Sequence, residues 1–208
     1  REIALDQPAT RIVALTPSDC EILCAIGCED ALVGRGKYCD YPESISALPV
    51  VQSGAETNIE EILALDPQVV LMSDMSQTEE QAKLLEQNGV KVVISDANDI
   101  AGVYTAIRMI GALMAKDDAA EALIGDMQAT FDEIAAKSEK SGKTIYFEVS
   151  PLQWGLWTAG SGTFMDELAT MCGVTNAFAD ISGWQSVSEE QVIERNPDYL
   201  SLIHISEP

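Results

Sequence analysis

The chain contains one helix-to-strand corner twice, and the second copy follows the first at an offset of 130 residues. The two copies occupy residues 58–71 and 188–200. Each begins with a helix N-cap residue, Asn58 or Ser188. Glu61 or Gln191 follows three positions later, which predicts a capping box in both copies. Acidic residues fill the first helical turn, and Asp-Pro or Asn-Pro ends the helix before an apolar strand. The repeat predicts a bilobed protein with paired acidic surfaces.

Short apolar runs alternate with helical patterns over residues 11–96. We expect strands at 11–15, 31–34, 68–72 and 91–95. After the first strand, Thr16-Pro17-Ser18 is expected to cap a helix that continues through Ile26 and is closed by Gly27. Apolar strands separated by helices are typical of a parallel sheet covered on both faces. The predicted fold class is therefore α/β.

Residues 99–140 are helical in pattern, with a break at 116–118. The second segment, 118–140, would be about 34 Å long at 1.5 Å per residue, which suits a strut between lobes. A new strand is predicted at 144–149 and a helix at 164–171, with two strands at most up to residue 199. The expected division is an N-terminal lobe at 1–117, a connecting helix at 118–140 and a partial C-terminal lobe at 141–199.

Residues 200–208 resemble the conceptual translation of a sequencing-library adapter. We therefore expect a non-native tail there and a second lobe that is truncated near Tyr199. The competing interpretation is a true strand over 199–205 with His204, the only histidine, as a site. At the other end there is no initiator Met, signal peptide or lipidation motif, so we expect a targeting segment to be missing or removed.

The net charge is −22, from 34 acidic and 12 basic residues. Such a surface repels nucleic acid and anionic lipid, so neither is expected as a partner. No stretch is suited to span a membrane, because the most apolar one, residues 100–115, is short and contains Arg108. Most of the acidic residues are expected to serve solubility.

Several segments together resemble the iron-chelate and vitamin B12 substrate-binding proteins of ABC importers, the helical-backbone class of periplasmic binding proteins. The resemblance covers about residues 2–199 and is specific for the family, not for its cargo. It is carried by residues 11–18 with 21–23, Tyr38-Cys39-Asp40-Tyr41-Pro42, the first copy of the corner, residues 157–164, and Gly183-Trp184 before the second copy.

The resemblance implies two lobes joined by one long helix, a ligand held between them, and an extracytoplasmic, non-enzymatic monomer that is periplasmic or a cell-surface lipoprotein. It also implies one acidic residue on each lobe that docks onto arginines of a dimeric ABC permease. Glu60 and Glu190 match by position. The alternative is that both acids only complement the helix dipole, worth about 0.3–1 kcal/mol.

Loops after parallel strands are the expected ligand-binding positions. All three tryptophans fall within residues 154–184 in loop-like contexts, and rigid aromatic surfaces suit a large flat ligand. The candidate ligand-binding residues are Thr16, Pro17, Tyr38, Asp40, Tyr41, Gly54, Glu56, Trp154, Trp157 and Trp184. The expected ligand is an iron chelate (a siderophore or haem) or a corrinoid.

Charge favours a neutral or weakly charged cargo such as a corrinoid, a hydroxamate or a haem-like macrocycle. Of five arginines, only Arg35 lies near a predicted ligand loop, together with Lys37, whereas an anionic ferric siderophore needs several cations. Cobalamin binders of this family commonly carry an aromatic residue ahead of the acidic helix. Here that stretch is Gly54-Ala55-Glu56-Thr57, which weakens a specific B12 assignment.

No bare metal ion or resident cofactor is expected. Cys20, Cys24 and Cys28 recur every four residues, but the spacing matches no common zinc pattern, and small buried apolar cysteines are the better interpretation. One rival function is a chelatase-like tetrapyrrole enzyme of related α/β architecture, which would need a histidine or another base in its site. A second rival is an adhesion or scaffold module.

Overall fold

The computed structural model describes residues 3, 5–54, 56–73, 77–150 and 152–202. The chain divides into two compact units. The first comprises residues 1–97 and 103–125, and the second comprises residues 98–102 and 126–208. Among the described residues, no helix combines the length and the apolar character needed to cross a membrane.

The first unit is built on a five-stranded sheet whose order is β3-β2-β1-β4-β5. Every pair in it is parallel, which confirms the predicted parallel sheet. The strands are β1 (Ile12–Ala14), β2 (Leu32–Gly36), β3 (Val50–Val51), β4 (Val69–Met72) and β5 (Lys91–Ile94). Only β3, two residues long, has no counterpart among the predicted strands.

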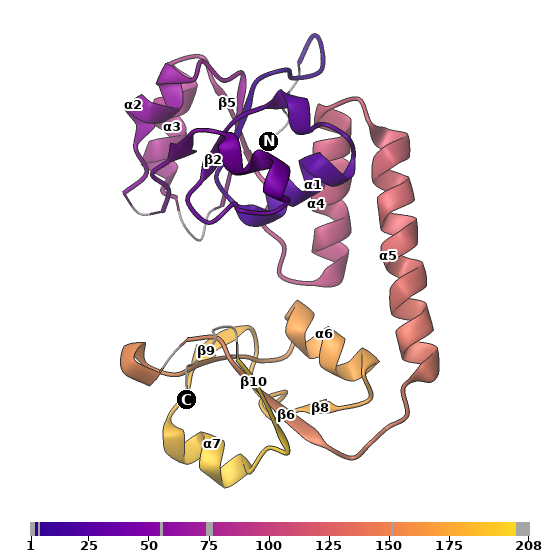
Figure 1. The fold of residues 1–208 in the computed structure, drawn as a ribbon. Helices are drawn as coiled ribbons and strands as arrows, with labels where there is room; N and C mark the ends of the chain where they lie inside the picture. Colours follow the sequence, from indigo (N-terminus) through magenta and orange to yellow (C-terminus); the bar gives the residue numbers. More distant parts are fainter. Residues whose placement is uncertain (1–2, 4, 55, 74–76, 151, 203–208) are drawn as a thin grey trace. The chain divides into compact units, whose positions relative to one another are not determined.

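Helices cover both faces of this sheet (Figure 1). They are α1 (Pro17–Ala25), α2 (Ile59–Ala64), α3 (Glu79–Gln87) and α4 (Ile100–Leu113), with 3₁₀ turns η1 (Glu29–Ala31) and η2 (Glu43–Ala47). Alternate strand residues face opposite sides, as strand geometry requires. Ile12 and Leu71 pack with Leu23 of α1, whereas Val13 and Val70 pack with α2 and α3.

Helix α5 (Asp117–Lys137) belongs to both units, because the boundary falls after Gly125. Its first half packs through the buried Ala120 and Ile124. Further along, Met127 and Phe131 are only half-buried. The predicted break before this helix is confirmed, although the helix begins and ends slightly earlier than the pattern indicated.

The second unit contains two small sheets. Its parallel sheet has the order β10-β6-β8, and a separate antiparallel pair joins β7 and β9. The elements are β6 (Thr144–Glu148), η3 (Leu152–Trp154), β7 (Trp157–Ala159), α6 (Phe164–Met171), β8 (Thr175–Asn176), β9 (Trp184–Ser186), α7 (Glu189–Arg195) and β10 (Tyr199–Leu202). The expectation of two strands at most was wrong, because strands of two or three residues are too short to show a periodic pattern.

Helices also cover both faces of the parallel sheet in the second unit. Tyr146 of β6 packs with Phe178 and with Val192 of α7. Phe147, the next residue, packs with Ala169 of α6 on the other face. The helix predicted at 164–171 is confirmed at those bounds.

Strand β10 pairs with β6 over all four of its residues. Leu200, Ser201 and Leu202 therefore belong to a strand in this structure. His204 and the rest of 203–208 lie outside the described residues. The non-native origin of 200–208 stays a prediction.

Candidate functional site

The first acidic corner is capped by only half of the predicted capping box. Asn58 accepts a hydrogen bond from the backbone N–H of Glu61 at 3.2 Å. The Glu61 carboxylate, however, accepts from the backbone N–H of Gln52 at 3.1 Å, not from Asn58. The backbone N–H of Asn58 instead donates to the carbonyl of Gln52 at 3.0 Å. Gln52, directly after β3, thus bonds both groups that would bond each other in a complete capping box: the Glu61 carboxylate and the backbone N–H of Asn58.

The second acidic corner has the complete box. The Ser188 hydroxyl accepts from the backbone N–H of Gln191 at 3.3 Å, and the Gln191 side chain accepts from the backbone N–H of Ser188 at 2.9 Å. Here the prediction is confirmed.

Both helices end in the same way. Asp66 has φ 49° and Asn196 has φ 44°, and a proline follows each. Short polar residues tolerate this left-handed conformation, and proline stops the helix. Two residues later, Gln68 accepts from the backbone N–H of Thr10 at 2.7 Å, and Asp198 accepts from that of Thr144 at 2.9 Å. The repeat seen in the sequence therefore extends to its hydrogen bonds.

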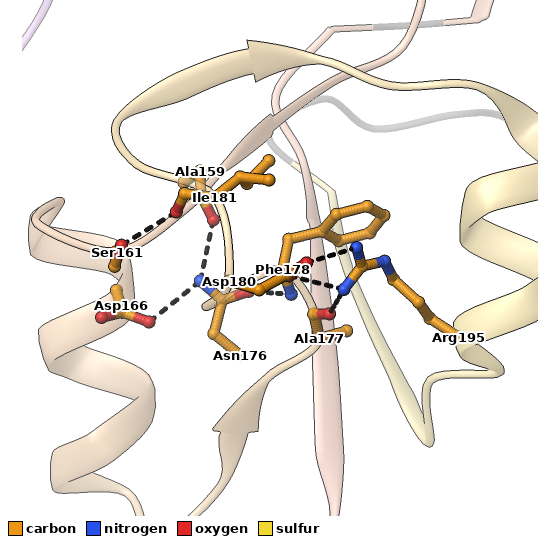
Figure 2. Close-up of polar contacts among 9 residues, drawn as sticks. All are labelled: Ala159, Ser161, Asp166, Asn176, Ala177, Phe178, Asp180, Ile181 and Arg195. Atoms are coloured by element: carbon orange, nitrogen blue, oxygen red, sulfur yellow. Dashed lines mark hydrogen bonds and ion pairs between the residues drawn. The ribbon is translucent and has the colours of Figure 1, made fainter.

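An arginine holds each corner. Arg11 donates to the carbonyl of Asp66 at 2.8 Å and to that of Leu65, at the C-terminal end of α2. Arg195, in the last turn of α7, pairs with both carboxylate oxygens of Asp180 at 2.6 and 2.8 Å. It also donates to the carbonyl of Ala177 at 2.7 Å, and its guanidinium lies 4.2 Å from the centre of the Phe178 ring. Figure 2 shows this cluster.

The acids proposed for docking, Glu60 and Glu190, are both exposed in the first turns of these anchored helices. A hydrogen bond from its own backbone N–H lowers the pKa of Glu190, and the Ser188 hydroxyl lowers it further. Glu190 is therefore fully ionised near neutral pH.

In the first unit, exposed aromatic residues lie at the edge of the sheet where the parallel strands end. Tyr38 and Tyr41, in the loop after β2, are 71% and 67% exposed. The Lys37 ammonium lies 5.5 Å from the centre of the Tyr38 ring. Asp40 and Pro17 are also exposed. This edge presents aromatic surface to solvent beside a single nearby cation on the same loop.

Two other predicted residues, Gly54 and Glu56, follow β3 at the same edge. Gly54 has φ +105°, which an L side chain rarely adopts. Glu56 is exposed and accepts from the side-chain amide of Gln52 at 3.5 Å.

The side chain of Thr16 makes a hydrogen bond to a residue of the helix that it precedes. It is the N-cap residue of α1 but makes no side-chain cap hydrogen bond. Its hydroxyl instead donates to the Asp19 carboxylate at 2.5 Å, and the Ser95 hydroxyl donates to the other oxygen of that carboxylate. Burial raises the pKa of Asp19 to about 6, although both hydrogen bonds oppose the rise.

Arg35 lies next to the predicted ligand loop, but its charge is directed into the protein. It is buried in β2, and it donates to the carbonyl of Cys39 at 2.8 Å and to that of Ser46 at 3.0 Å. In the sequence, Arg35 and Lys37 are the cations near this loop. In the structure, Arg35 holds the backbone of the loop, so only Lys37 of the two presents its charge to solvent there. The strand predicted at 31–34 ends one residue before Arg35, so the sequence pattern did not indicate that this side chain would be buried.

In the second unit, the exposed aromatic residues follow β6. Trp154, in η3, is 77% exposed, and Trp157, which starts β7, is 43% exposed. Leu152, which was not among the predicted site residues, is also exposed and lies in the same 3₁₀ turn as Trp154. Trp184 differs, because it is half-buried and its ring centre lies 6.0 Å from that of Phe164. Trp184 therefore serves in part as a core residue.

A buried amide organises the turn between β7 and α6. The Asn176 side chain donates to the carbonyl of Ala159 at 2.8 Å and to Asp166 at 3.0 Å (Figure 2). The backbone N–H of Ser161, two residues after β7, donates to the carbonyl of Ile181 at 2.7 Å. This turn is part of the segment 157–164 that carries the family resemblance.

The cysteine pattern does not form a metal site in the described part of the chain, where no group of three or more His, Cys, Asp or Glu residues is arranged to hold an ion. Cys20 and Cys28 are buried and Cys24 is half-buried. Helix α1 ends at Ala25, so Cys28 lies outside it, as predicted.

Comparison with known proteins decides the family. The model of a family described as periplasmic binding protein matches residues 12–202. The chain belongs to this family. Its members in the comparison are binding proteins, not enzymes, in agreement with the non-enzymatic expectation and against the chelatase alternative.

Three relatives describe the similarity. The ABC transporter substrate-binding lipoprotein YvrC of Bacillus subtilis is 31% identical over 96% of this chain. The vitamin B12-binding protein of Salmonella choleraesuis is 31% identical over 92% of it. The crystal structure of a possible iron-binding, periplasmic solute-binding protein from Staphylococcus epidermidis is 31% identical over 93% of the chain and superimposes with a TM-score of 0.78. The chain spans 65%, 71% and 76% of these proteins, respectively.

Proposed function

We propose that this protein captures a metal chelate outside the cytoplasm and delivers it to an ABC importer. The cargo class is a corrinoid or an iron chelate, either a siderophore or haem. The protein itself would act as a monomer and without catalysis. Membership of the periplasmic binding protein family supports the general role, and relatives named as a B12-binding protein, a substrate-binding lipoprotein and an iron-binding protein support the cargo class and the location.

The observation that carries the proposal is the exposure of aromatic side chains on both units. Tyr38 and Tyr41 follow β2, and Trp154 and Trp157 follow β6. Large exposed apolar groups gathered at strand ends favour a ligand-binding surface over a solvated one. Aromatic rings with few rotatable bonds match the faces of a large, flat chelate.

The other predicted contact residues have smaller roles in the same proposed binding surface. Pro17, Asp40, Gly54 and Glu56 would border the aromatic residues of the first unit. Trp184 would contribute only the part of its ring that Phe164 leaves uncovered.

The charge distribution favours a neutral or weakly charged cargo. Arg35 is engaged by two backbone carbonyls, so Lys37 is the cation left on that loop. A ferric tricatecholate, with several negative charges, would meet a chain whose net charge is −22. Because offsetting such charges requires several cations, we expect the chain to discriminate against it.

Tryptophan fluorescence tests the cargo. We expect cyanocobalamin, haemin or a neutral ferric hydroxamate to quench the emission of the chain saturably, and a ferric tricatecholate to do so much more weakly. Trp154→Ala should remove most of the quenching. Ile193→Ala is the control, because Ile193 is equally exposed but lies on α7. If none of the three chelates binds, the proposed cargo class is wrong.

Glu60 and Glu190 are proposed to dock onto arginines of the dimeric permease. Their exposure at the first turns of two anchored helices supports this role. In membranes containing the cognate importer, Glu60→Ala/Glu190→Ala should lower uptake by at least tenfold and leave ligand affinity unchanged. Glu80→Ala/Glu194→Ala removes the same charge from other exposed positions and should transport normally. A loss of affinity in the first variant would overturn the assignment.

A further inference from the structure

Two buried thiols meet at one backbone oxygen in the first unit. Cys20 lies within α1, and Cys39 lies in the loop after β2. Both side chains are 0% exposed. The sulfur of Cys20 lies 3.9 Å from the carbonyl oxygen of Ala14, and the sulfur of Cys39 lies 3.8 Å from the same atom. Because both sulfurs approach the same carbonyl oxygen, the two thiols share one small region of the core, and side-chain rotation can bring the sulfurs together.

The two thiols differ in acidity. The interaction with the Cys39 thiol raises the pKa of Cys20, and burial raises it further. The interaction with the Cys20 thiol lowers the pKa of Cys39; burial opposes this, and a backbone hydrogen bond from Gly36 and the charge of Arg35 support it. Cys39 is thus the sulfur that ionises first. Such asymmetry suits thiol–disulfide exchange, in which one thiolate attacks and its partner resolves the intermediate.

The other three cysteines have different surroundings. Burial raises the pKa of Cys24 and of Cys28, and the Cys28 thiol donates to the carbonyl of Ile26 at 3.9 Å. Cys172 is exposed in the second unit. These three serve as internal comparisons for the pair.

We propose that Cys20 and Cys39 form a reversible intramolecular disulfide that ties α1 to the loop bearing Tyr38 and Tyr41. The co-reactant is a small disulfide such as oxidised glutathione, which reaches the thiols before the core closes around them. The Cys39 thiolate attacks one sulfur of that disulfide, forms a mixed disulfide and releases one thiolate. Cys20 then loses its proton and attacks the Cys39 sulfur, which breaks the mixed disulfide and releases the second thiol. Two electrons and two protons leave the protein pair for the external disulfide.

The bond would complete the fixation of this loop. Arg35 already holds the loop through the carbonyls of Cys39 and Ser46. A disulfide between Cys39 and Cys20 would also attach this loop to α1. Because the disulfide closes a covalent ring in the chain, it would reduce the number of conformations open to the unfolded protein. The oxidised chain should therefore unfold at a higher temperature than the reduced chain.

Peptide mapping of the full chain tests the proposal directly. The chain is refolded in a mixture of reduced and oxidised glutathione, or in dithiothreitol, then denatured, alkylated and digested without reduction. We expect a peptide linking Cys20 to Cys39 as the main disulfide in the glutathione sample, with three of the five cysteines alkylated. In dithiothreitol all five should be alkylated. Alkylation of both Cys20 and Cys39 in both samples, or pairing of either with another cysteine, would overturn the proposal.

Thermal unfolding with matched variants provides a second, independent readout. The wild-type chain should melt at a higher temperature after glutathione treatment than in dithiothreitol, and Cys39→Ser should show no such difference. Cys24→Ser/Cys172→Ser, which keeps the pair, should behave like wild type. If Cys39→Ser does not fold, the wild-type peptide map decides alone. An equal redox difference in a folded Cys39→Ser would contradict the assignment.

Discussion

Asp19 is a carboxyl group with no exposed surface, held between the hydroxyls of Thr16 and Ser95. Burial raises its pKa from 3.8 to about 6, despite both hydrogen bonds. The folded protein therefore binds this proton more tightly than the unfolded chain does. The stability that Asp19 contributes is complete below about pH 4 and is lost as the pH rises through 6. The special environment of Asp19 could not be predicted from the sequence, because a single Asp in a first helical turn is typical of ordinary capping.

Asp19→Asn should change the pH dependence of stability. At about 1.4 kcal/mol per pKa unit, the shift corresponds to about 3 kcal/mol between pH 4 and pH 7. We expect the free energy of unfolding of the wild type, relative to that of the variant, to fall by about this amount across that interval. Urea denaturation at a series of pH values measures it. A constant difference between the two proteins would show that Asp19 titrates normally.

Substitution of Arg195 should lower the stability of the second unit more than substitution of an arginine in an exposed ion pair lowers stability. Arg195→Lys loses the two-pronged contact with Asp180 and the planar stacking on Phe178. Because the group is partly exposed, we expect a loss of about 1–2 kcal/mol in the stability of the second unit. Arg108→Lys is the control, since Arg108 and Glu121 are both more than half exposed and an exposed pair contributes little to stability. Equal losses from the two variants would mean that Arg195 does not anchor α7.

At the scale of elements, the repeated corner could be predicted because each of its parts has a local cause. N-caps, first-turn acids and a proline after the helix are visible in the sequence, and the left-handed Asp66 and Asn196 agree with them. The partner of the Glu61 carboxylate could not be predicted, since it depends on β3, a two-residue strand without a pattern. The strands β7, β8 and β9 were missed for the same reason. Short strands form where the tertiary fold brings them together.

The turn between β7 and α6 allows a paired test of two glycines. A Cβ on Gly160 would lie 2.2 Å from the carbonyl oxygen of Ile181, whereas one on Gly125, within α5, would meet nothing within 4 Å. Gly160→Ala should therefore lower stability by about 1–3 kcal/mol, through overpacking. Gly125→Ala should raise it by about 0.5–1 kcal/mol, because alanine loses less conformational entropy in a helix. Chemical denaturation of both variants measures the contrast, and a neutral Gly160→Ala would contradict the close approach.

At the scale of the whole molecule, the α/β class and the parallel first sheet followed from alternating apolar runs, and the family followed from several motifs together. The individual roles of site residues were harder to predict. Thr16, Arg35 and Trp184 have the expected residue types at the expected positions, but each makes an internal contact instead of facing only solvent. The contacts of Thr16 and Arg35 are made to residues three and four positions away, but they depend on the folded path of the chain, and that of Trp184 is made to Phe164, twenty residues earlier. Tyr38, Tyr41, Trp154 and Trp157 remain exposed and carry the proposed function.

The most direct test of that function is calorimetric titration of the chain and two double variants with cyanocobalamin, haemin and a neutral ferric hydroxamate. Tyr41→Ala/Trp154→Ala removes one exposed ring from each unit. Leu84→Ala/Ile193→Ala removes exposed apolar side chains on α3 and α7. Buried aromatic anchors are worth about 2 kcal/mol or more. We therefore expect the first variant to bind the preferred chelate at least tenfold more weakly, with an unchanged melting temperature, and the second to bind like wild type. Equal affinity in all three proteins would contradict the proposed ligand-binding surface.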